Sequence, residues 1–150
     1  MYDNNDVLDS LVHTMVVGQS ANTYRNSKYV LDNGLLVETN FPSSKKRYVG
    51  GASNPLYPDI IIWKPNFPGA SSGTAVIIEE IETNKTLYNK SDYWKKLGDT
   101  GITFFLVVPE GKANDVLNII KQYGIRVDQI QTYTYNPTTK AYIFKNSGLV

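Results

Sequence analysis

The chain has 150 residues, of which 41% are hydrophobic and 19% are charged, the balance of an ordinary globular domain. Its 15 basic and 14 acidic residues leave a net charge of +1, so any contact with nucleic acid must use a local basic surface. The absence of cysteine excludes disulfide scaffolds, cysteine-ligated zinc and thiol nucleophiles. The single histidine, His13, excludes multi-histidine metal sites and disfavours a Ser-His-Asp triad.

Neither a membrane span nor a signal peptide is predicted. No apolar run approaches the roughly 18 residues that a membrane span requires. The N-terminal segment 1–6 is acidic and polar, unlike a signal peptide. We therefore expect one intracellular domain that spans residues 1–150.

The first third of the chain predicts helix, turn and strand. Apolar pairs recur every four residues from Val7 to Val16, so this segment is predicted to form an amphipathic helix that ends at Gly18. Asn33 and Gly34 form a turn signal. In chain order, the other predicted segments here are a short helical turn (29–31), a strand (35–40) and a polar, glycine-containing loop or hairpin (42–54).

Continuous apolar runs mark the rest of the chain and are typical of strands buried on both faces. A strand-helix-strand run from 75 to 108 implies a crossover and some parallel pairing. We therefore expect an α/β fold with a mixed sheet flanked by helices. The predicted elements are strands over 60–63 and 75–83, a helix over 86–97 with Leu87, Tyr88, Trp94 and Leu97 inside, a strand over 102–108, a helix over 113–123 capped by Gly124, and strands over 127–135 and 141–145.

Acidic residues stand at the ends of two predicted buried strands. Asp59 precedes one strand, and Glu79, Glu80 and Glu82 lie near the end of the next. Since strand side chains alternate between faces, Glu80 and Glu82 share one face and Glu79 takes the other. Pairing of the two strands as a hairpin would bring Asp59 towards Glu80 and Glu82. Carboxylates so close raise one another's pKa unless a cation lies among them, and such hard oxygen ligands suit Mg²⁺, Mn²⁺ or Ca²⁺.

Pro58-Asp59, followed after a gap by Glu80-Ile81-Glu82, resembles the motif of the PD-(D/E)xK nuclease superfamily. The core of that superfamily has the order α-β-β-β-α-β, which the predicted elements match from residue 6 to residue 108. Residues 94–97 and 101–109 also resemble the helix and strand that follow the motif there. The resemblance implies a restriction-endonuclease-like core and a metal-dependent hydrolysis of phosphodiester bonds in DNA.

The resemblance also assigns the metal site. Asp59 and Glu80 would hold Mg²⁺ or Mn²⁺, with the carbonyl oxygen of Ile81 as a further ligand. Position 82 carries Glu where the superfamily usually has Lys, a departure that resembles the Glu-x-Glu variant of some type II restriction endonucleases. Glu82 then either holds a second metal or accepts a proton from the attacking water.

Two further sets of residues complete the expected catalytic site. Lys85 or Lys96 is the alternative source of the missing cation. The superfamily often adds an acid from the first helix, where Asp6 and Asp9 are available. Glu79 belongs in the site only if the facing of its strand is the reverse of that expected.

Basic residues at two places are candidates for phosphate contacts, namely Lys45, Lys46 and Arg47 in the loop and Lys90, Lys95 and Lys96 on the helix predicted over 86–97. We expect a nuclease that acts on DNA as a homodimer, because one small chain offers one site for two strands. Two alternatives stay open. One is a non-catalytic DNA-binding or accessory protein on the same fold, favoured by the missing lysine. The other is an unrelated small α/β interaction protein, viral or from a mobile element, in which Asp59 and Glu80 would lie far apart.

Overall fold

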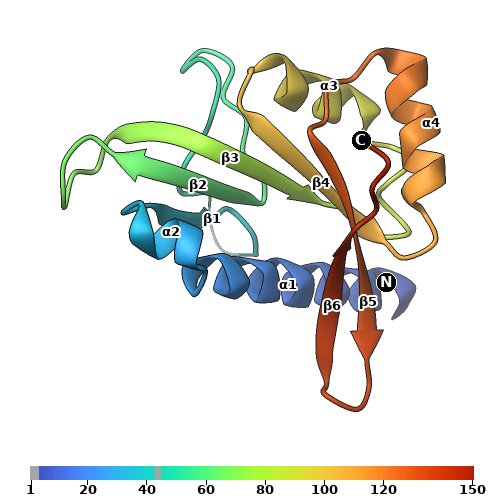
Figure 1. Ribbon diagram of the computed structural model, residues 1–150. Coiled ribbons are helices and arrows are strands. Elements are labelled where there is room, and N and C mark those ends of the chain that lie inside the picture. The colour runs from blue at the N-terminus through green and yellow to red at the C-terminus, as the bar shows by residue number, and fades with distance from the viewer. Residues whose placement is uncertain (1–3, 43–44) are drawn as a thin grey trace.

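The computed structural model describes residues 4–42 and 45–150, and within these the chain forms six strands and four helices (Figure 1). They are, in order, α1 (Asn4–Arg25), α2 (Lys28–Asp32), β1 (Leu36–Thr39), β2 (Ile60–Pro65), β3 (Gly73–Ile81), α3 (Ser91–Asp99), β4 (Thr103–Pro109), α4 (Ala113–Tyr123), β5 (Gln129–Asn136) and β6 (Ala141–Asn146). No helix within the described residues is both long and apolar enough to cross a membrane.

The six strands pair in chain order within one sheet. β1, β2 and β3 are antiparallel neighbours, β3, β4 and β5 are parallel, and β6 returns antiparallel to β5. The two parallel pairs follow from the crossovers through α3 and α4. The predicted α/β class with a mixed sheet is therefore confirmed.

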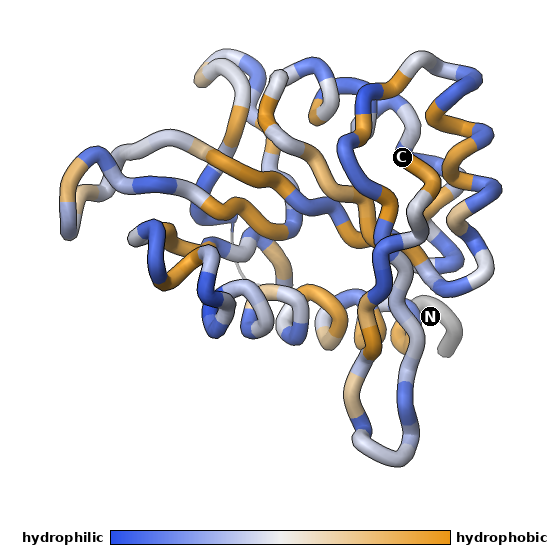
Figure 2. The backbone as a smooth tube through the Cα atoms, viewed as in Figure 1, coloured by the Kyte–Doolittle hydropathy of each residue, from blue (hydrophilic) through white to orange (hydrophobic). Residues whose placement is uncertain are grey.

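Helices cover both faces of the sheet (Figure 1). One core lies between the sheet and α3 with α4, and it includes Ile61, Trp94 and Phe104. The other lies between the sheet and α1 with α2, and it includes Val16 and Ile60. Figure 2 shows the apolar residues concentrated along the central strands. Burial on both faces explains why β2 and β3 are continuous apolar runs in the sequence.

Two helix boundaries differ from the sequence-based expectation. The first helix does not end at Gly18 but continues to Arg25, because Ser20 and Ala21 pack under the sheet and outweigh the low helix propensity of one glycine. The helix expected over 86–97 begins only at Ser91. Residues 84–88 form turns, and Thr83 and Thr86 share side-chain and backbone hydrogen bonds that stabilise them.

Side-chain burial corrects two further expectations. Tyr88 was expected inside its helix, but it lies in the turn segment and is exposed. The apolar pairs of α1 divide between inside and outside: Val12 and Val16 pack against the sheet, whereas their neighbours Leu11 and Met15 are exposed. The pairs therefore mark the helix correctly, but both members of the first pair, Val7 and Leu8, are exposed and each later pair supplies one inward-facing residue.

The end of α3 is held by a close backbone contact. A Cβ atom on Gly98 would lie 2.5 Å from the carbonyl oxygen of Arg126, so only glycine fits there. Arg126 Nε donates to the carbonyl oxygen of Gly98 over 3.0 Å. This contact fixes α3 against the segment that follows α4.

Glu79 is fully buried on the α1 face of the sheet. Ser20 donates a hydrogen bond to its Oε1 over 2.6 Å, and Tyr24 donates one to its Oε2 over 2.5 Å. Burial raises the pKa of Glu79 to about 7, even though the two hydroxyl donors oppose the rise. The folded state therefore binds this proton more tightly than the unfolded chain, and the contribution of Glu79 to stability falls as the pH rises from about 4.5 to about 7.

Glu79→Gln removes this titration while keeping an acceptor oxygen. In metal-free buffer, the free energy of unfolding of the variant relative to the wild type should increase between about pH 5 and about pH 8, by on the order of 2 kcal/mol. Urea unfolding at several pH values measures it. The exposed Glu110 supplies the control Glu110→Gln, which should show no such trend. A difference between Glu79→Gln and the wild type that does not change with pH would contradict the assignment.

Candidate functional site

The site lies where β2 begins and β3 ends. In the antiparallel pairing Ile60 stands opposite Glu79, so Asp59 comes level with Glu80. The backbone N–H of Asp59 donates to Glu80 Oε1 over 3.0 Å. The predicted convergence of Asp59 and Glu80 is therefore confirmed. This closeness contradicts the expectation for the unrelated interaction protein, in which the two acids would be far apart.

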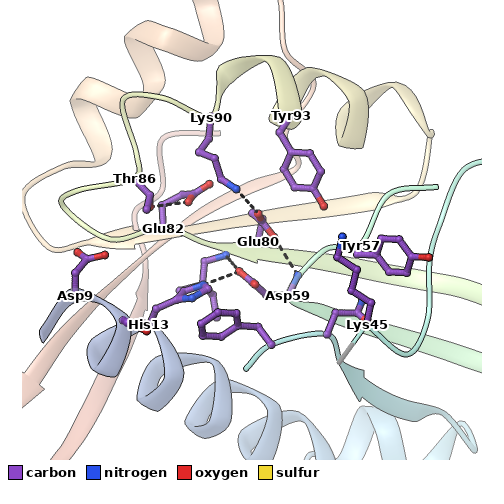
Figure 3. A pocket seen from close by; sticks show the side chains of 14 residues that line it. Asp9, His13, Lys45, Tyr57, Asp59, Glu80, Glu82, Thr86, Lys90 and Tyr93 are labelled. Carbon is purple, nitrogen blue, oxygen red and sulfur yellow. Dashed lines mark hydrogen bonds and ion pairs between the residues drawn. The ribbon is translucent and has the colours of Figure 1, made fainter. Parts of the chain in front are cut away.

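Two donors orient the carboxylate of Asp59 (Figure 3). Its Oδ2 accepts a hydrogen bond of 2.9 Å from the backbone N–H of Ile81 and one of 3.0 Å from His13 Nε2. Burial disfavours the charged imidazole, but the hydrogen bond and charge of Asp59 outweigh it, so the pKa of His13 is raised. Among the described residues no hydrogen bond reaches Asp59 Oδ1. That oxygen is left for a ligand in the cavity described below.

Lys90 supplies a positive charge to Glu80. Its Nζ lies 3.6 Å from Glu80 Oε2, and the carboxylate is buried while the lysine is partly exposed. Burial, together with repulsion from Asp59 and Glu82, raises the pKa of Glu80 well above its ordinary value, and Lys90 opposes this rise. Burial disfavours the ammonium of Lys90, but the charge of Glu80 outweighs it and the pKa of Lys90 is raised. Lys90 is thus a cation at this site.

Glu82 lies on the same side of the strand as Glu80 and is bound to the segment around α3. Thr86 donates to its Oε1 over 2.8 Å, and the indole of Trp94 donates to its Oε2 over 2.6 Å. Burial raises the pKa of Glu82, and Lys90 opposes the rise. Both carboxylate oxygens are therefore already hydrogen-bonded to the element that carries Lys90.

The acids open into a cavity of about 400 Å³. Its walls come from α1, from the loop between β1 and β2, and from the segment that enters α3 (Figure 3). The polar and charged side chains of the lining are Asp9, Ser10, His13, Asn40, Lys45, Tyr57, Asp59, Glu80, Glu82, Thr86, Lys90 and Tyr93. Asp9 accepts a hydrogen bond of 2.8 Å from Thr83, so α1 does contribute an acid. The side chain of Asp6 lies outside the described part of the chain.

The lysine that pairs with Glu80 is not one of the two expected. Neither Lys85 nor Lys96 lines the cavity, and both are exposed. The reason is the late start of α3: residue 90 comes directly before its first turn, and its side chain reaches Glu80. Glu79 stays on the opposite face, as expected from strand alternation.

The expected phosphate contacts lie in different places. Lys45 lies at the cavity, with its ammonium 4.8 Å from the centre of the Tyr57 ring. Lys46 and Arg47 line a separate surface depression. The guanidinium of Arg47 stacks on Trp63, with its Cζ atom 3.4 Å from the centre of the Trp63 ring. Lys95 lies outside both and pairs with Asp99 on the exposed side of α3.

Sequence reasoning did not place His13 at the site, and it named Lys90 only as a candidate phosphate contact. His13 follows Val12 on the buried side of α1, and a polar residue at such a position was the only signal for it. The pairing of Lys90 with Glu80 had no sequence signal apart from the closeness of this lysine to the acids. Both reach the site because their helices pack against opposite faces of the sheet.

The oxygen donors of the site fit a divalent cation. Within the described residues no three His, Asp or Glu side chains are grouped as a complete metal site. Mg²⁺ does not need such a group, because it is usually held by one or two carboxylates and keeps several waters. Asp59 Oδ1, the Glu80 carboxylate and the carbonyl oxygen of Ile81 are the donors that would hold it.

Three comparisons with known proteins give no relative. No protein-family model, no curated protein and no solved structure matches this chain. Membership of the PD-(D/E)xK superfamily therefore stays a prediction, and the function must be argued from the site.

A divalent cation should stabilise the fold, because it would relieve the repulsion between Asp59 and Glu80. In thermal or urea unfolding, Mg²⁺ or Mn²⁺ at about 100 times its dissociation constant should add about 2.7 kcal/mol to the free energy of unfolding. Glu80→Gln should lose this gain. Glu79→Gln changes the neighbouring acid on the other face of the sheet, and this variant should keep the stabilisation by the cation. Equal stabilisation of the wild type and Glu80→Gln would show that the cation binds elsewhere.

Proposed function

We propose that this protein is a metal-dependent deoxyribonuclease with a restriction-endonuclease-like core. The observation that carries the proposal is the pair of buried carboxylates, Asp59 and Glu80, which face one cavity together with the Lys90 ammonium. The order α1-α2-β1-β2-β3-α3-β4, which is α-β-β-β-α-β apart from the short helix α2, supports the proposed core. Mg²⁺ or Mn²⁺ would be held by Asp59, Glu80 and the carbonyl of Ile81.

The residues of the cavity have separate roles in this proposal. When bound, the cation polarises the scissile phosphate and lowers the pKa of a coordinated water. His13 and the Ile81 amide keep the Asp59 carboxylate turned towards the cavity. Lys90 faces the same space and offsets the negative charge that develops on the phosphate. It takes the part that the resemblance gives to the missing lysine.

Glu82 has a positioning role in this proposal rather than either role expected from the sequence. Its two oxygens accept hydrogen bonds from Thr86 and Trp94. These bonds tie the end of β3 to the turn and helix on either side of Lys90. The position of the lysine relative to Glu80 therefore depends on the carboxylate at position 82.

Three basic residues provide the local positive surface that a chain of net charge +1 needs for DNA. Lys45 stands at the cavity, and Lys46 and Arg47 lie next to it in sequence on the surface depression. We propose that they contact phosphates on either side of the bond that is cut. Lys95 lies outside both the cavity and the surface depression, so it is the least supported of the expected DNA contacts.

Non-catalytic DNA binding is the second candidate function. The observation that favours it is the glutamate at position 82, where the superfamily usually has lysine. The two functions differ in one property, which is cleavage in the presence of a divalent cation.

The homodimer expected from the sequence stays a prediction. Several apolar side chains on the outer side of α1 are about half exposed, namely Val7, Leu8, Leu11 and Met15. Exposed apolar patches mark contact surfaces, so this side of α1 is the surface that a second copy would use.

Purified protein should cut DNA with Mg²⁺ or Mn²⁺ and lose all cleavage in EDTA. The reason is that the described residues include no cysteine, and the one histidine is bound to Asp59. Gel assays on labelled single-stranded, nicked and duplex DNA measure this. Cleavage that persists in EDTA would overturn the metal-dependent mechanism, and binding without cleavage under every metal condition would favour the second candidate.

Lys90→Ala should slow cleavage by about 10²–10³ at saturating substrate, because one charge-stabilising group is lost. Lys96→Ala is the matched control, since Lys96 is an exposed lysine of α3 outside the cavity, and it should cut at the wild-type rate. Lys90→Arg should recover part of the lost rate. If Lys96→Ala were the slow variant and Lys90→Ala were not, the assignment of the cation would be wrong.

A further inference from the structure

The acids of the proposed site are deeply recessed. The exposed fractions are 7% for Asp59, 4% for Glu80 and 2% for Glu82. A substrate can meet them only in the cavity, whose volume of about 400 Å³ equals that of a cube with an edge of about 7 Å. A duplex is wider than this, since the major groove of B-form DNA alone is about 12 Å wide, so it can lie across the mouth of the cavity but cannot enter it. The space inside suits one nucleotide.

Aromatic rings form much of the wall around the acids. Phe41 and Tyr57 come from the loop between β1 and β2, and Tyr93 comes from α3. Phe41 lies against His13 with ring centres 4.1 Å apart. The Tyr93 hydroxyl is close to the backbone of Tyr57, so the two tyrosines lie next to one another although they come from different elements (Figure 3).

Each tyrosine of this wall is paired with a lysine. The ammonium of Lys45 lies 4.8 Å from the centre of the Tyr57 ring, and that of Lys90 lies 4.8 Å from the centre of the Tyr93 ring. The cations suit phosphate groups, and flat rings suit the faces of bases. The wall thus offers both kinds of contact that one nucleotide of a strand needs.

The remaining charges of the cavity favour an uncharged group beside the phosphate. Asp9, Asp59, Glu80 and Glu82 outnumber the cationic side chains of the lining. These acids balance the charges of the bound cation, Lys45 and Lys90, so no excess positive charge is left for a second phosphate deep in the cavity. A neutral base against the aromatic wall needs none.

We infer that the strand bound in this cavity is unpaired DNA, with its scissile phosphate at Asp59, Glu80 and Lys90 and a flanking base against Tyr57 and Tyr93. The inference rests on the proposed function for the chemistry at the acids, and it adds the substrate class. A paired base would first have to leave its stack, whereas an unpaired base enters without that loss. One site per strand is then sufficient, so cleavage does not require a homodimer.

Binding and cleavage are measured separately to test this. The probes are a fluorescent oligo(dT), an abasic oligodeoxynucleotide of the same length, and a closed duplex dumbbell without free ends. Anisotropy with Ca²⁺ gives affinities, and gels with Mg²⁺ give cleavage. Wild-type protein should bind and cut oligo(dT) better than the dumbbell, and should bind the abasic strand about 5- to 100-fold more weakly than oligo(dT).

Variants of the aromatic wall identify the source of this preference. Tyr57→Leu should weaken binding of oligo(dT) about 5- to 100-fold and leave the abasic strand unaffected, because only a base stacks on the ring. Tyr57→Phe keeps the ring and should bind like the wild type. Tyr123→Leu removes an exposed tyrosine at the end of α4 and is the matched control. If Tyr57→Leu does not fold, the comparison of oligo(dT) with the abasic strand on wild-type protein decides.

The outcomes separate the two proposals. Preference for oligo(dT) without any cleavage would support the unpaired substrate and overturn the nuclease. Cleavage of the dumbbell as fast as oligo(dT), or equal affinity for oligo(dT) and the abasic strand, would overturn the unpaired substrate and leave the nuclease in place. Absence of both binding and cleavage would overturn both.

Discussion

An exchange of hydrogen bonds between two strand ends fixes the geometry on which the site depends. The backbone N–H of Asp59, just before β2, donates to the Glu80 side chain, and the backbone N–H of Ile81, at the end of β3, donates to the Asp59 side chain. The backbone of each strand thus holds the carboxylate of the other. Buried carboxylates are tolerated only when they are hydrogen-bonded or paired with charge, and this exchange supplies part of that requirement within the sheet.

The helices on the two faces of the sheet supply the remaining partners of the buried carboxylates. α1 brings His13 to Asp59, and the segment before α3 brings Lys90 to Glu80. Each acid thus has its own basic side chain as a partner, and the two side chains come from opposite faces of the sheet. Burial, together with repulsion between the acids, still raises the pKa of Glu80, so further positive charge at the site would stabilise the carboxylates. The acids lie at the bottom of a cavity, and α1 and α3 form part of its walls.

The parts of the site that could be predicted are those governed by local periodicity. The two-residue repeat of a strand was enough to separate Glu79 from Glu80 and Glu82, and a hairpin was enough to bring Asp59 to them. The same reasoning could not find the contact of His13 with Asp59 or of Lys90 with Glu80, because these contacts depend on how α1 and α3 pack on the sheet. Lys85 and Lys96 do not line the cavity, because the turn segment 84–88 delays the start of α3.

The helix ends of the fold likewise depend partly on local sequence and partly on tertiary contacts. The helix over 113–123 was predicted with its correct ends, since Gly124 takes the left-handed conformation that stops a helix. Gly18 gave a similar signal but sits inside α1, with open space where a Cβ would be. Contacts of Ser20 and Tyr24 with Glu79 hold the helix beyond it. A glycine therefore ends a helix only where no tertiary contact continues it.

Asp59 and Glu80 are proposed to hold a divalent cation, and anomalous diffraction from crystals can locate such an ion. Crystals soaked in Mn²⁺ should give an anomalous peak within coordination distance of Asp59 Oδ1, the Glu80 carboxylate and the Ile81 carbonyl oxygen. The same soak of Glu80→Gln crystals should give none there. A wild-type structure without a peak at saturating Mn²⁺, with Lys90 still paired to Glu80, would contradict the account.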